Sequence, residues 1–443
     1  MKITYLSKFK NAIVTLVILI FSCSLSLAGE NEVTKIVQDS LDVSARYAKL
    51  PADDTCISCH IEEEALPEGF SENDIHMQAG LSCAGCHGGD NTIDDEDESM
   101  NEDIGFTGAP EIEDIPSLCA KCHSDIGFMR EYQPRIATDQ LEQYYTSTHG
   151  KKFKQGDENV ATCISCHTAH SIMSAKDPRS SVYALNVPKT CNSCHGNSEH
   201  MADYNIKTDQ FEKYAESVHG KALLDREDTG APACNDCHGN HGAAPPGVAS
   251  VSHVCGSCHV QNEEYFSKTK MAKEFAVDDM HACQECHGNH EIAKPTDEMV
   301  GIGEKSICME CHDEGEKGYL AADSIHIMLT RVTASYDSAE AKLKEVQIIG
   351  MDDVEMGFML QDARQDLIHS RTLVHSFDPQ QVKEKTDVAL KNSQAAIQLG
   401  IKELEDYDSR RMGLGVATLF ITILSIALFF KIRDIDKEEN KSN

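Results

Sequence analysis

The sequence has 443 residues and a formal net charge of −33 at pH 7. A chain this acidic is repelled by nucleic acid and by anionic lipid surfaces, so both are excluded as partners. Cysteine accounts for 19 residues, and the spacing of these cysteines indicates how they are used.

The first 28 residues are typical of a secretory signal peptide. Three lysines precede an apolar run over residues 12–28, and Ser26-Leu27-Ala28 supplies the small residues of a cleavage site. Lipid attachment at Cys23 is an alternative, although Phe21 fits a lipoprotein signal poorly. We therefore expect the mature chain to begin near residue 29 and to lie outside the cytoplasm.

Nine Cys-x-x-Cys-His motifs follow between residues 56 and 312. In this motif the two thiols form thioethers with the vinyl groups of a haem, and the histidine binds the iron as the proximal ligand. The motifs use 18 of the 19 cysteines. They are Cys56-Cys59-His60, Cys83-Cys86-His87, Cys119-Cys122-His123, Cys163-Cys166-His167, Cys191-Cys194-His195, Cys234-Cys237-His238, Cys255-Cys258-His259, Cys283-Cys286-His287 and Cys308-Cys311-His312.

Disulfides and zinc are the alternative uses of paired cysteines. A disulfide framework needs no histidine after every second cysteine, and structural zinc sites often take two such pairs, whereas nine is an odd number. Histidine makes up only 21 of the 443 residues, yet it follows all nine pairs. We therefore predict nine covalently attached c-type haems.

The motif-bearing segment is short for so many cofactors. From residue 56 to residue 312 there are 257 residues, or about 29 for each motif. The haems themselves must then form the core, because so little chain cannot build an aliphatic core around each one. Glycine, asparagine, aspartate and serine surround the motifs, which predicts short helices and irregular loops. We assign residues 29–318 to a nine-haem cytochrome c domain of mainly α class.

Acidic residues are concentrated in residues 90–103, between the second and third motifs. The simplest interpretation is a solvated surface loop. A docking patch for a basic partner and a weak calcium loop are the alternatives.

Two stretches of the chain repeat one phrase. Residues 139–153 and 209–223 agree at eight of fifteen positions, including the Tyr, Ser, His, Gly and Lys of the phrase Tyr-x-x-Ser-x-His-Gly-Lys. Each copy reads as a short helix that ends at the glycine, Gly150 or Gly220. We predict that the histidines of the phrase, His149 and His219, are distal ligands of haem irons.

Twelve histidines lie outside the motifs, enough to give every iron a second histidine. His170, His241 and His290 each follow a proximal histidine by three residues, and can reach only a neighbouring haem. A third, degenerate copy of the phrase begins at Tyr265, with Lys270 at the histidine position, where His281 is a substitute. The candidate distal ligands are His76, His149, His170, His200, His219, His241, His253, His281, His290 and His326.

The composition changes after the last motif. Residues 319–349, 351–376 and 380–411 are predicted to form long helices, the second with an apolar stripe that includes Val354, Ala363 and Leu367. The third helix should begin at Asp378-Pro379. We assign residues 319–411 to a helical domain. Its His369 and His375 are six residues apart, so at most one of them faces a given haem.

Residues 412–430 form an uncharged run of 19 residues, enough for one transmembrane helix. A buried core helix is the alternative. With the body placed outside by the signal peptide, residues 431–443 should form a cytoplasmic tail. The predicted fold is therefore a mainly α multihaem body, a bundle of long helices and one C-terminal transmembrane helix.

The nine motifs, the STHGK and SVHGK phrases and the two CHGNH segments resemble the membrane-anchored multihaem cytochromes c of anaerobic respiratory chains. These form the cytochrome c3, NapC/NirT and hydroxylamine-oxidoreductase-like group. The resemblance covers residues 56–312 and implies bis-histidine haems that shuttle electrons between the quinone pool and periplasmic partners. Two features differ: no Cys-x-x-Cys-Lys motif is present, and NapC-type proteins are anchored at the N-terminus rather than the C-terminus.

Two functions follow as expectations. The first is a nonahaem electron-transfer protein, single-pass in the inner membrane with its haem domain in the periplasm. It would link a quinone-linked membrane subunit, or quinol, to periplasmic or outer-surface redox proteins. The second is a reductase or oxidoreductase of small nitrogen or sulfur compounds, such as nitrite, hydroxylamine or tetrathionate, which requires one open haem.

Overall fold

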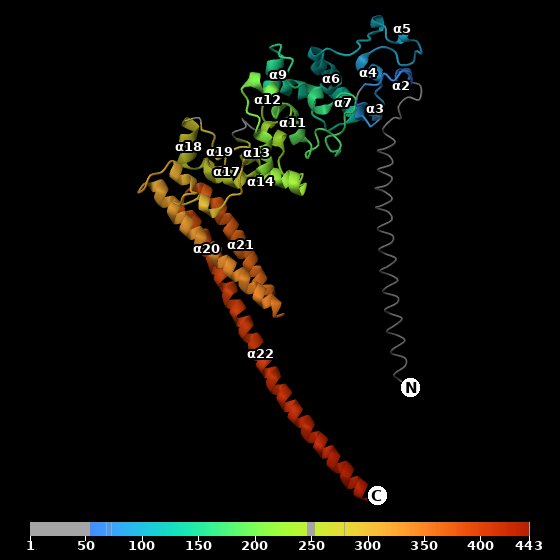
Figure 1. Cartoon of the computed structure of the whole chain (residues 1–443). Coiled ribbons are helices and arrows are strands. Elements are labelled where there is room, and N and C mark those ends of the chain that lie inside the picture. The colour runs from blue at the N-terminus through green and yellow to red at the C-terminus, as the bar shows by residue number, and fades with distance from the viewer. Residues whose placement is uncertain (1–53, 68, 72, 246–252, 279, 443) are drawn as a thin grey trace. The chain divides into compact units, whose positions relative to one another are not determined.

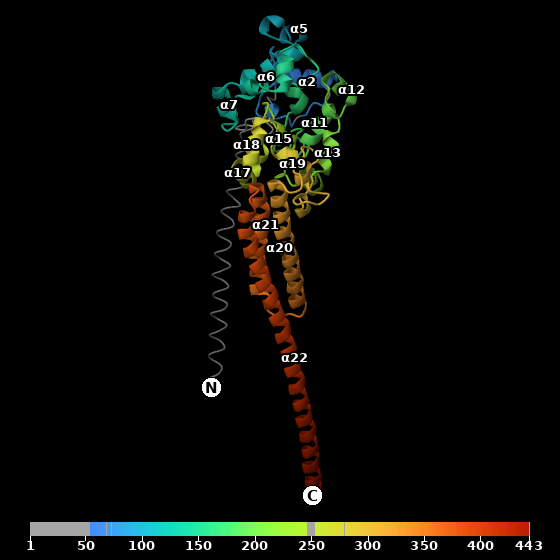
Figure 2. The ribbon, with the colours of Figure 1, turned by 90° about the vertical axis from the view of Figure 1, so that its left-hand side faces the viewer.

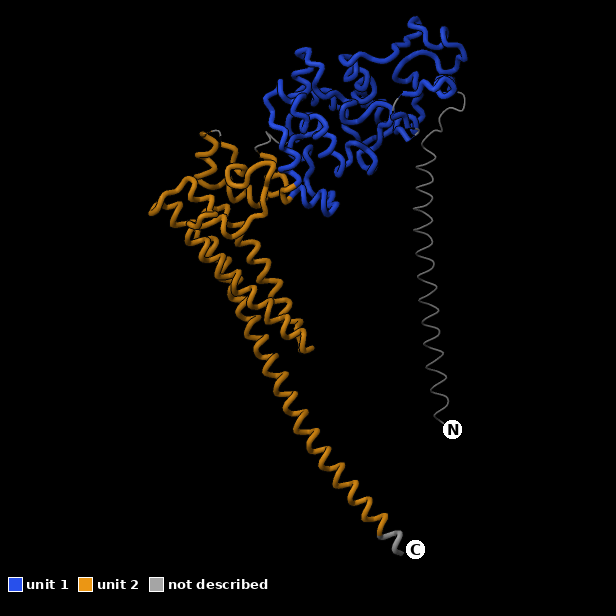
Figure 3. The backbone as a smooth tube through the Cα atoms, viewed as in Figure 1, with its two compact units in different colours: residues 1–215, 219–247 blue, residues 216–218, 248–443 orange. Residues whose placement is uncertain are grey.

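A computed structural model describes residues 54–67, 69–71, 73–245, 253–278 and 280–442 (Figure 1). Helices and irregular loops make up the described residues, which contain no strand, so the predicted fold class is confirmed. The chain divides into two compact units (Figure 3). The first comprises residues 1–215 and 219–247, and the second residues 216–218 and 248–443. The division falls inside the segment that the sequence assigns to a single haem domain.

Short helices dominate the chain up to residue 245. The α-helices there are α2 (Thr55–Glu62), α3 (Ile75–Gln78), α4 (Cys83–His87), α5 (Glu96–Ser99), α6 (Ile115–His123), α7 (Ile126–Tyr132), α8 (Gln140–Tyr144), α9 (Thr148–Phe153), α10 (Cys163–His167), α11 (Val187–His195), α12 (Ser198–Met201), α13 (Gln210–Glu216), α14 (Val218–Gly220) and α15 (Cys234–His238). Single 3-10 turns are η1 (Glu102–Ile104), η2 (Ile112–Asp114) and η3 (Ala202–Tyr204), and η4 (Lys221–Asp225) is a π-helical turn.

Longer helices appear towards the C-terminus. After residue 253 the chain forms α16 (Cys255–Cys258), α17 (Val260–Ser267), α18 (Lys270–Val277), α19 (Cys283–His287), α20 (Lys317–Ile348), α21 (Val354–Leu373) and α22 (Pro379–Ser442), with the 3-10 turns η6 (Asp297–Met299), η7 (Ile307–Glu310) and η8 (Val374–Ser376).

Apolar packing differs between the motif-bearing segments and the long helices. In the first unit, the described residues form one small buried apolar cluster, around Val187, Leu223 and Ala233. In the second unit, buried clusters run along α20, α21 and α22. The first unit therefore has too little aliphatic core to hold its chain together alone, as expected where cofactors complete the core.

The three long helices match the predicted ones and pack side by side (Figure 2). Their seam is lined by small side chains that let the backbones approach closely, such as Ala339, Ala363 and Ala396, which are fully buried. One detail of the predicted stripe is wrong. Val354 is 62% exposed because it is the first residue of α21, and Met356 takes the buried position instead.

Helix α22 begins where the sequence predicted. Pro379 is its first residue, and the Asp378 carboxylate accepts a hydrogen bond from the Gln380 amide at 2.9 Å. Gly400 does not interrupt the helix. A Cβ there would lie 2.5 Å from Lys342 Cγ on α20 and 3.0 Å from Met356 Cε on α21, so glycine permits close packing against both helices.

The C-terminal half of α22 carries the apolar run. Side chains from Met412 to Ile435 are exposed, including Phe420 at 68% and Leu428 at 52%. Among the described residues, α22 is the one helix with a segment long and apolar enough to cross a bilayer. Because the apolar window is not buried in the protein, the alternative of a buried core helix has no support.

Candidate functional site

Each Cys-x-x-Cys pair occupies about one helical turn, which places both thiols on the same face. The second, fourth, sixth and eighth motifs are five-residue helices that start at the first cysteine and end at the histidine. A residue with positive φ follows each of them: Gly88, Thr168, Gly239 and Gly288. The first, third and fifth motifs instead lie within or at the end of the longer helices α2, α6 and α11. Two kinds of motif thus alternate over the first six motifs, whereas the seventh forms the four-residue α16 and the ninth begins in the 3-10 turn η7.

The spacing of imidazole rings tests whether these residues fit haem iron. A histidine nitrogen lies about 2 Å from a metal that it binds. Two imidazoles on opposite faces of one iron therefore have ring centres about 6 Å apart. Among the described residues, the rings at this separation include five pairs: His87–His170, His149–His195, His167–His241 and His287–His375 at 6.1 Å, and His76–His123 at 5.9 Å. The residues present fit bis-histidine haem.

Each of the five pairs joins one motif histidine to one histidine from elsewhere. His170 follows the fourth motif and faces the second, and His241 follows the sixth and faces the fourth. His76 precedes the second motif and faces the third, and His149 precedes the fourth and faces the fifth. Two of these histidines thus face the motif two places before the one they follow, and two face the motif directly after the one they precede. Each relation recurs two motifs further along, so the chain is built on a repeat of two motifs.

The ring planes follow the same repeat. The rings at the second, fourth and eighth motifs are nearly parallel, with interplanar angles of 11°, 14° and 26°. The rings at the third and fifth motifs are crossed, with angles of 84° and 53°. The two kinds of helix therefore correspond to two kinds of histidine pair.

Burial sets the protonation of these histidines. Burying an imidazole disfavours its charged form, so the ring remains neutral near pH 7 and keeps a nitrogen lone pair for a metal. The imidazoles whose pKa is lowered, in each case chiefly by burial, are His123, His149, His167, His170, His195, His241, His287 and His375.

Hydrogen bonds fix the orientation of several rings. His87 Nδ1 donates to the Gly108 carbonyl at 2.7 Å, which leaves Nε2 for a metal. His76 Nδ1 lies 3.3 Å from the buried Asp74 carboxylate. The same carboxylate accepts from the amide of Ile172 at 2.6 Å, two residues beyond His170. Asp74 thus connects the segments that carry His76 and His170.

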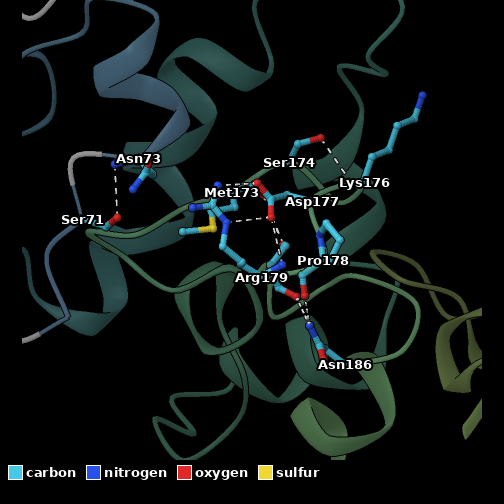
Figure 4. Close-up of polar contacts among 10 residues, drawn as sticks. Ser71, Asn73, Met173, Ser174, Lys176, Asp177, Pro178, Arg179 and Asn186 are labelled. Atoms are coloured by element: carbon cyan, nitrogen blue, oxygen red, sulfur yellow. Dashed lines mark hydrogen bonds and ion pairs between the residues drawn. The ribbon is translucent and has the colours of Figure 1, made fainter. Parts of the chain in front are cut away.

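Residues 171–186, which run from His170 towards the fifth motif, are held by side-chain bonds (Figure 4). The Asn186 amide donates to the carbonyls of Pro178 and Ser180, both at 2.8 Å. Arg179 pairs with Asp177 at 2.7 Å on the surface. Such local bonds rigidify a loop that lacks regular structure, so His170, which directly precedes the loop, is held in place.

The repeated phrase has a different geometry from the one predicted. His149 lies in the first turn of α9, whose N-cap Ser147 accepts a hydrogen bond from the Gly150 amide at 3.0 Å. Gly150 is inside the helix and is not left-handed. A Cβ on Gly150 would overlap the Tyr144 carbonyl, and one on Gly220 would overlap the Tyr214 carbonyl. Both glycines are therefore required for close backbone contact. The prediction that Gly150 ends a helix is wrong, whereas Gly220 is the last residue of α14 but stays right-handed and leads into the π-helical turn η4.

The tyrosine of the phrase ties the helix to the next motif. Tyr144 Oη donates to the Ala161 carbonyl at 2.9 Å, and Tyr214 Oη donates to the Pro232 carbonyl at 2.8 Å. Both acceptors lie two residues before the first cysteine of a motif. The phrase thus sets the position of a histidine relative to the following motif.

Neighbouring motifs also contact one another through their cysteines. In three cases a cysteine raises the pKa of a cysteine in the next motif: Cys163 raises that of Cys119, Cys234 that of Cys191, and Cys255 that of Cys283. The 18 described cysteines form no disulfide, so that alternative has no support. The third and fourth, the fifth and sixth, and the seventh and eighth sites therefore lie side by side.

The remaining candidates are placed as follows. His200 stacks on Tyr204, and His326 Nδ1 donates to the Asp297 carbonyl at 2.9 Å. His219 lies in α14, His253 precedes α16, and His281 and His290 flank α19. Sequence reasoning left the choice between His369 and His375 open. His375 faces His287, while His369 bonds Tyr265 Oη at 3.2 Å. Periodicity alone could not choose between these two.

The acidic segment 90–103 contains α5 and η1 and is largely exposed. Among the described residues, no three acidic, histidine or cysteine side chains gather closely enough to hold a metal ion by themselves. Neither the calcium-loop alternative nor the zinc alternative therefore has structural support.

Comparisons with known families agree with this geometry. Residues 75–196 match the model of the cytochrome c3 family, and residues 26–88 match that of the cytochrome c554 and c-prime family. The first match spans four of the nine motifs and four of the five histidine pairs lie partly or wholly within it. No curated protein and no solved structure matches the chain.

Proposed function

We propose that this chain, which is a multihaem c-type electron-transfer cytochrome, carries nine haems and conducts electrons along them. The observation that carries the proposal is the set of five histidine pairs at the spacing of a single iron. A bis-histidine haem exchanges one electron without exchanging a ligand. The chain's own contribution is to hold both imidazoles of each pair and to exclude water from them by burial.

The order of the sites supports a linear conductor. Cysteines close enough to shift one another's pKa link the third site to the fourth and the fifth to the sixth in the first unit, and the seventh to the eighth in the second unit. Each distal histidine spans one or two motifs, which couples the position of each site to that of its neighbours. Rigid spacing of this kind suits electron transfer, because the sites need not move.

We further propose that residues 1–28 are removed as a signal peptide and that residues 412–430 anchor the protein in the inner membrane. The haem-bearing residues 29–318 and the helical residues 319–411 would then lie in the periplasm, with residues 431–443 in the cytoplasm. The anchor contains no histidine and cannot bind a haem of its own. Electrons would therefore enter from a quinone-linked membrane partner or leave to it, with periplasmic or outer-surface redox proteins at the other end.

Cutting the chain before Arg410 is expected to release a soluble protein that still carries nine haems, because no motif lies beyond residue 312. The full-length protein should carry the same number and sediment with the membranes. A pyridine haemochrome assay on both forms, with a salt wash of the membrane fraction, measures both quantities. Four or five haems per chain would contradict the proposal, and a truncated form that stays membrane-bound would indicate lipid at Cys23 or a membrane-bound partner.

A second function, chemistry at an open haem, is favoured by the first motif. His60 faces no imidazole in the described residues, which include all 21 histidines, and residues 1–53 contain none. Carboxylates surround this motif: Cys59 Sγ donates to Asp94 at 3.7 Å, and Asp54 caps α2. A negative field disfavours anionic ligands such as nitrite and favours neutral ones such as hydroxylamine.

The oxidised protein is expected to show a high-spin ferric signal from the haem at His60, and the reduced protein should bind carbon monoxide there. Both signals follow from a single protein ligand on the iron. Electron paramagnetic resonance and carbon monoxide titration measure them in the parent protein and in a Cys56→Ser, Cys59→Ser variant that lacks this haem. If the stoichiometry of carbon monoxide binding is the same in both, the haem at His60 is closed and electron transfer remains its function.

A further inference from the structure

The third copy of the repeated phrase can be aligned with the first by its hydrogen bonds rather than by its residue identities. In the first copy, the Ser147 amide and hydroxyl both donate to the Tyr144 carbonyl, at 3.0 and 2.6 Å, and the Ser147 hydroxyl accepts from the Gly150 amide at 3.0 Å. In the third copy, the Thr269 amide and hydroxyl donate to the Phe266 carbonyl, at 2.9 and 2.7 Å. The Thr269 hydroxyl accepts from the Ala272 amide at 3.0 Å.

These three matching bonds fix the register of the third copy. Thr269 corresponds to Ser147 as the N-cap of its helix, and α18 corresponds to α9. Two residues after the N-cap, the first copy has His149 and the third has Met271. Alignment on Tyr265, which placed Lys270 at the histidine position, is therefore wrong by one residue. Methionine, unlike lysine at neutral pH, is an ordinary axial ligand of c-type haem.

The repeat also indicates which haem Met271 would serve. His149 precedes the fourth motif and faces His195 of the fifth. Met271 precedes the eighth motif, so its counterpart is His312 of the ninth.

His312 needs a ligand partner of another kind. Its Nδ1 lies 3.3 Å from the Glu316 carboxylate, the usual orientation of a metal-binding imidazole with its second nitrogen free. No imidazole ring faces it within the described part of the chain, although every histidine lies in that part. The ninth site therefore has a proximal histidine and, by the repeat, a methionine where the fifth site has His149.

We propose that Met271 is the second axial ligand of the haem held by Cys308, Cys311 and His312. The inference rests on the proposed function, since it requires that haem to be attached. Thioether ligation favours the ferrous state, so this haem would have a higher potential than its bis-histidine neighbours. An electron passing from the eighth site would be held at the ninth, the site directly before α20 and the anchored helical domain. The step moves one electron from ferrous to ferric iron and needs no proton.

The test is a redox titration of the parent, Met271→His and Met271→Leu, together with near-infrared absorption of the oxidised proteins. The parent should show one high-potential haem and the weak charge-transfer band that methionine sulfur gives to ferric haem. Met271→His should lose the band, and its ninth haem should titrate among the low-potential haems. Met271→Leu should lose the band and gain a high-spin signal. Met280→Leu, on the same segment, should match the parent.

Absence of the near-infrared band from the parent overturns the proposal without any variant. So does a set of titrations in which both Met271 variants overlay the parent, and in that case His281→Met is the variant expected to shift. A haemochrome assay on every sample separates this outcome from failure of the proposed function. It gives nine haems whether or not Met271 is a ligand, and fewer only if the motifs do not bind haem.

Discussion

Replacing His375 with leucine is expected to convert one haem from low-spin to high-spin and to create a carbon monoxide site on the reduced protein. The ring of His375 lies 6.1 Å from that of His287, and its Nδ1 donates to the Thr372 carbonyl at 3.0 Å, which turns Nε2 away from the backbone. The Asn262 amide nitrogen lies alongside the ring, 3.3 Å from each nitrogen. Leucine fills the space but offers no ligand.

His369→Leu is the matched control, because it removes an imidazole six residues earlier on the same helical segment. That ring bonds Tyr265 Oη at 3.2 Å and faces no proximal histidine. The control should keep all low-spin haems and lose only this hydrogen bond, worth about 1 kcal/mol. Electron paramagnetic resonance on both variants measures the difference. Equal high-spin signals in the two, or none in either, would show that His375 does not ligate iron.

The contrast between these two histidines shows where sequence reasoning stops. The nine motifs are local, since two thiols and a histidine need only one helical turn, so their positions can be read from the chain. The proposed pairing of each motif histidine with a distal histidine is not local. His170 and His87 are 83 residues apart, and only the fold brings them to 6.1 Å. His170 and His241 were predicted to serve neighbouring haems because each lies only three residues after a proximal histidine, too close to reach the far side of that histidine's own iron. No sequence pattern indicated that each would face the motif two places earlier.

The long helices, unlike the distal pairing, were predictable because their signals are local in sequence. Their apolar stripes and the Asp378-Pro379 start are local signals, and α20, α21 and α22 begin within three residues of the predicted positions. The errors occurred where tertiary contact decides. Val354 fits the apolar periodicity but lies at the exposed start of α21. Gly150 was predicted to end a helix because glycine adopts left-handed conformations, whereas the structure requires glycine there because a Cβ would overlap the Tyr144 carbonyl.

Gly150→Ala is therefore expected to damage the fifth haem site without touching a ligand. The new Cβ would overlap the Tyr144 carbonyl and come within 2.8 Å of the Tyr145 Cα, and neither is the end of a flexible side chain. Overpacking of this kind costs about 1–3 kcal/mol, or roughly 5–10 °C in the unfolding midpoint at its upper end. The adjacent His149 should move with the helix, so part of the haem at His195 should become high-spin.

Gly127→Ala separates this effect from a general intolerance of the haem-bearing unit. Gly127 lies in α7, and a Cβ there meets only Asp125 Oδ1 at 3.2 Å, the N-cap oxygen of the helix, which need move by only a few tenths of an ångström and can keep its hydrogen bonds. Since alanine favours a helix over glycine by roughly 0.5–1 kcal/mol, this variant should be as stable as the parent or slightly more so. Thermal unfolding followed at the Soret band, with electron paramagnetic resonance on the same samples, compares the two. If Gly150→Ala keeps both the parent's midpoint and a fully low-spin fifth haem, close backbone contact is not why the phrase requires glycine, and His149 is held by Ser147 and Tyr144 alone.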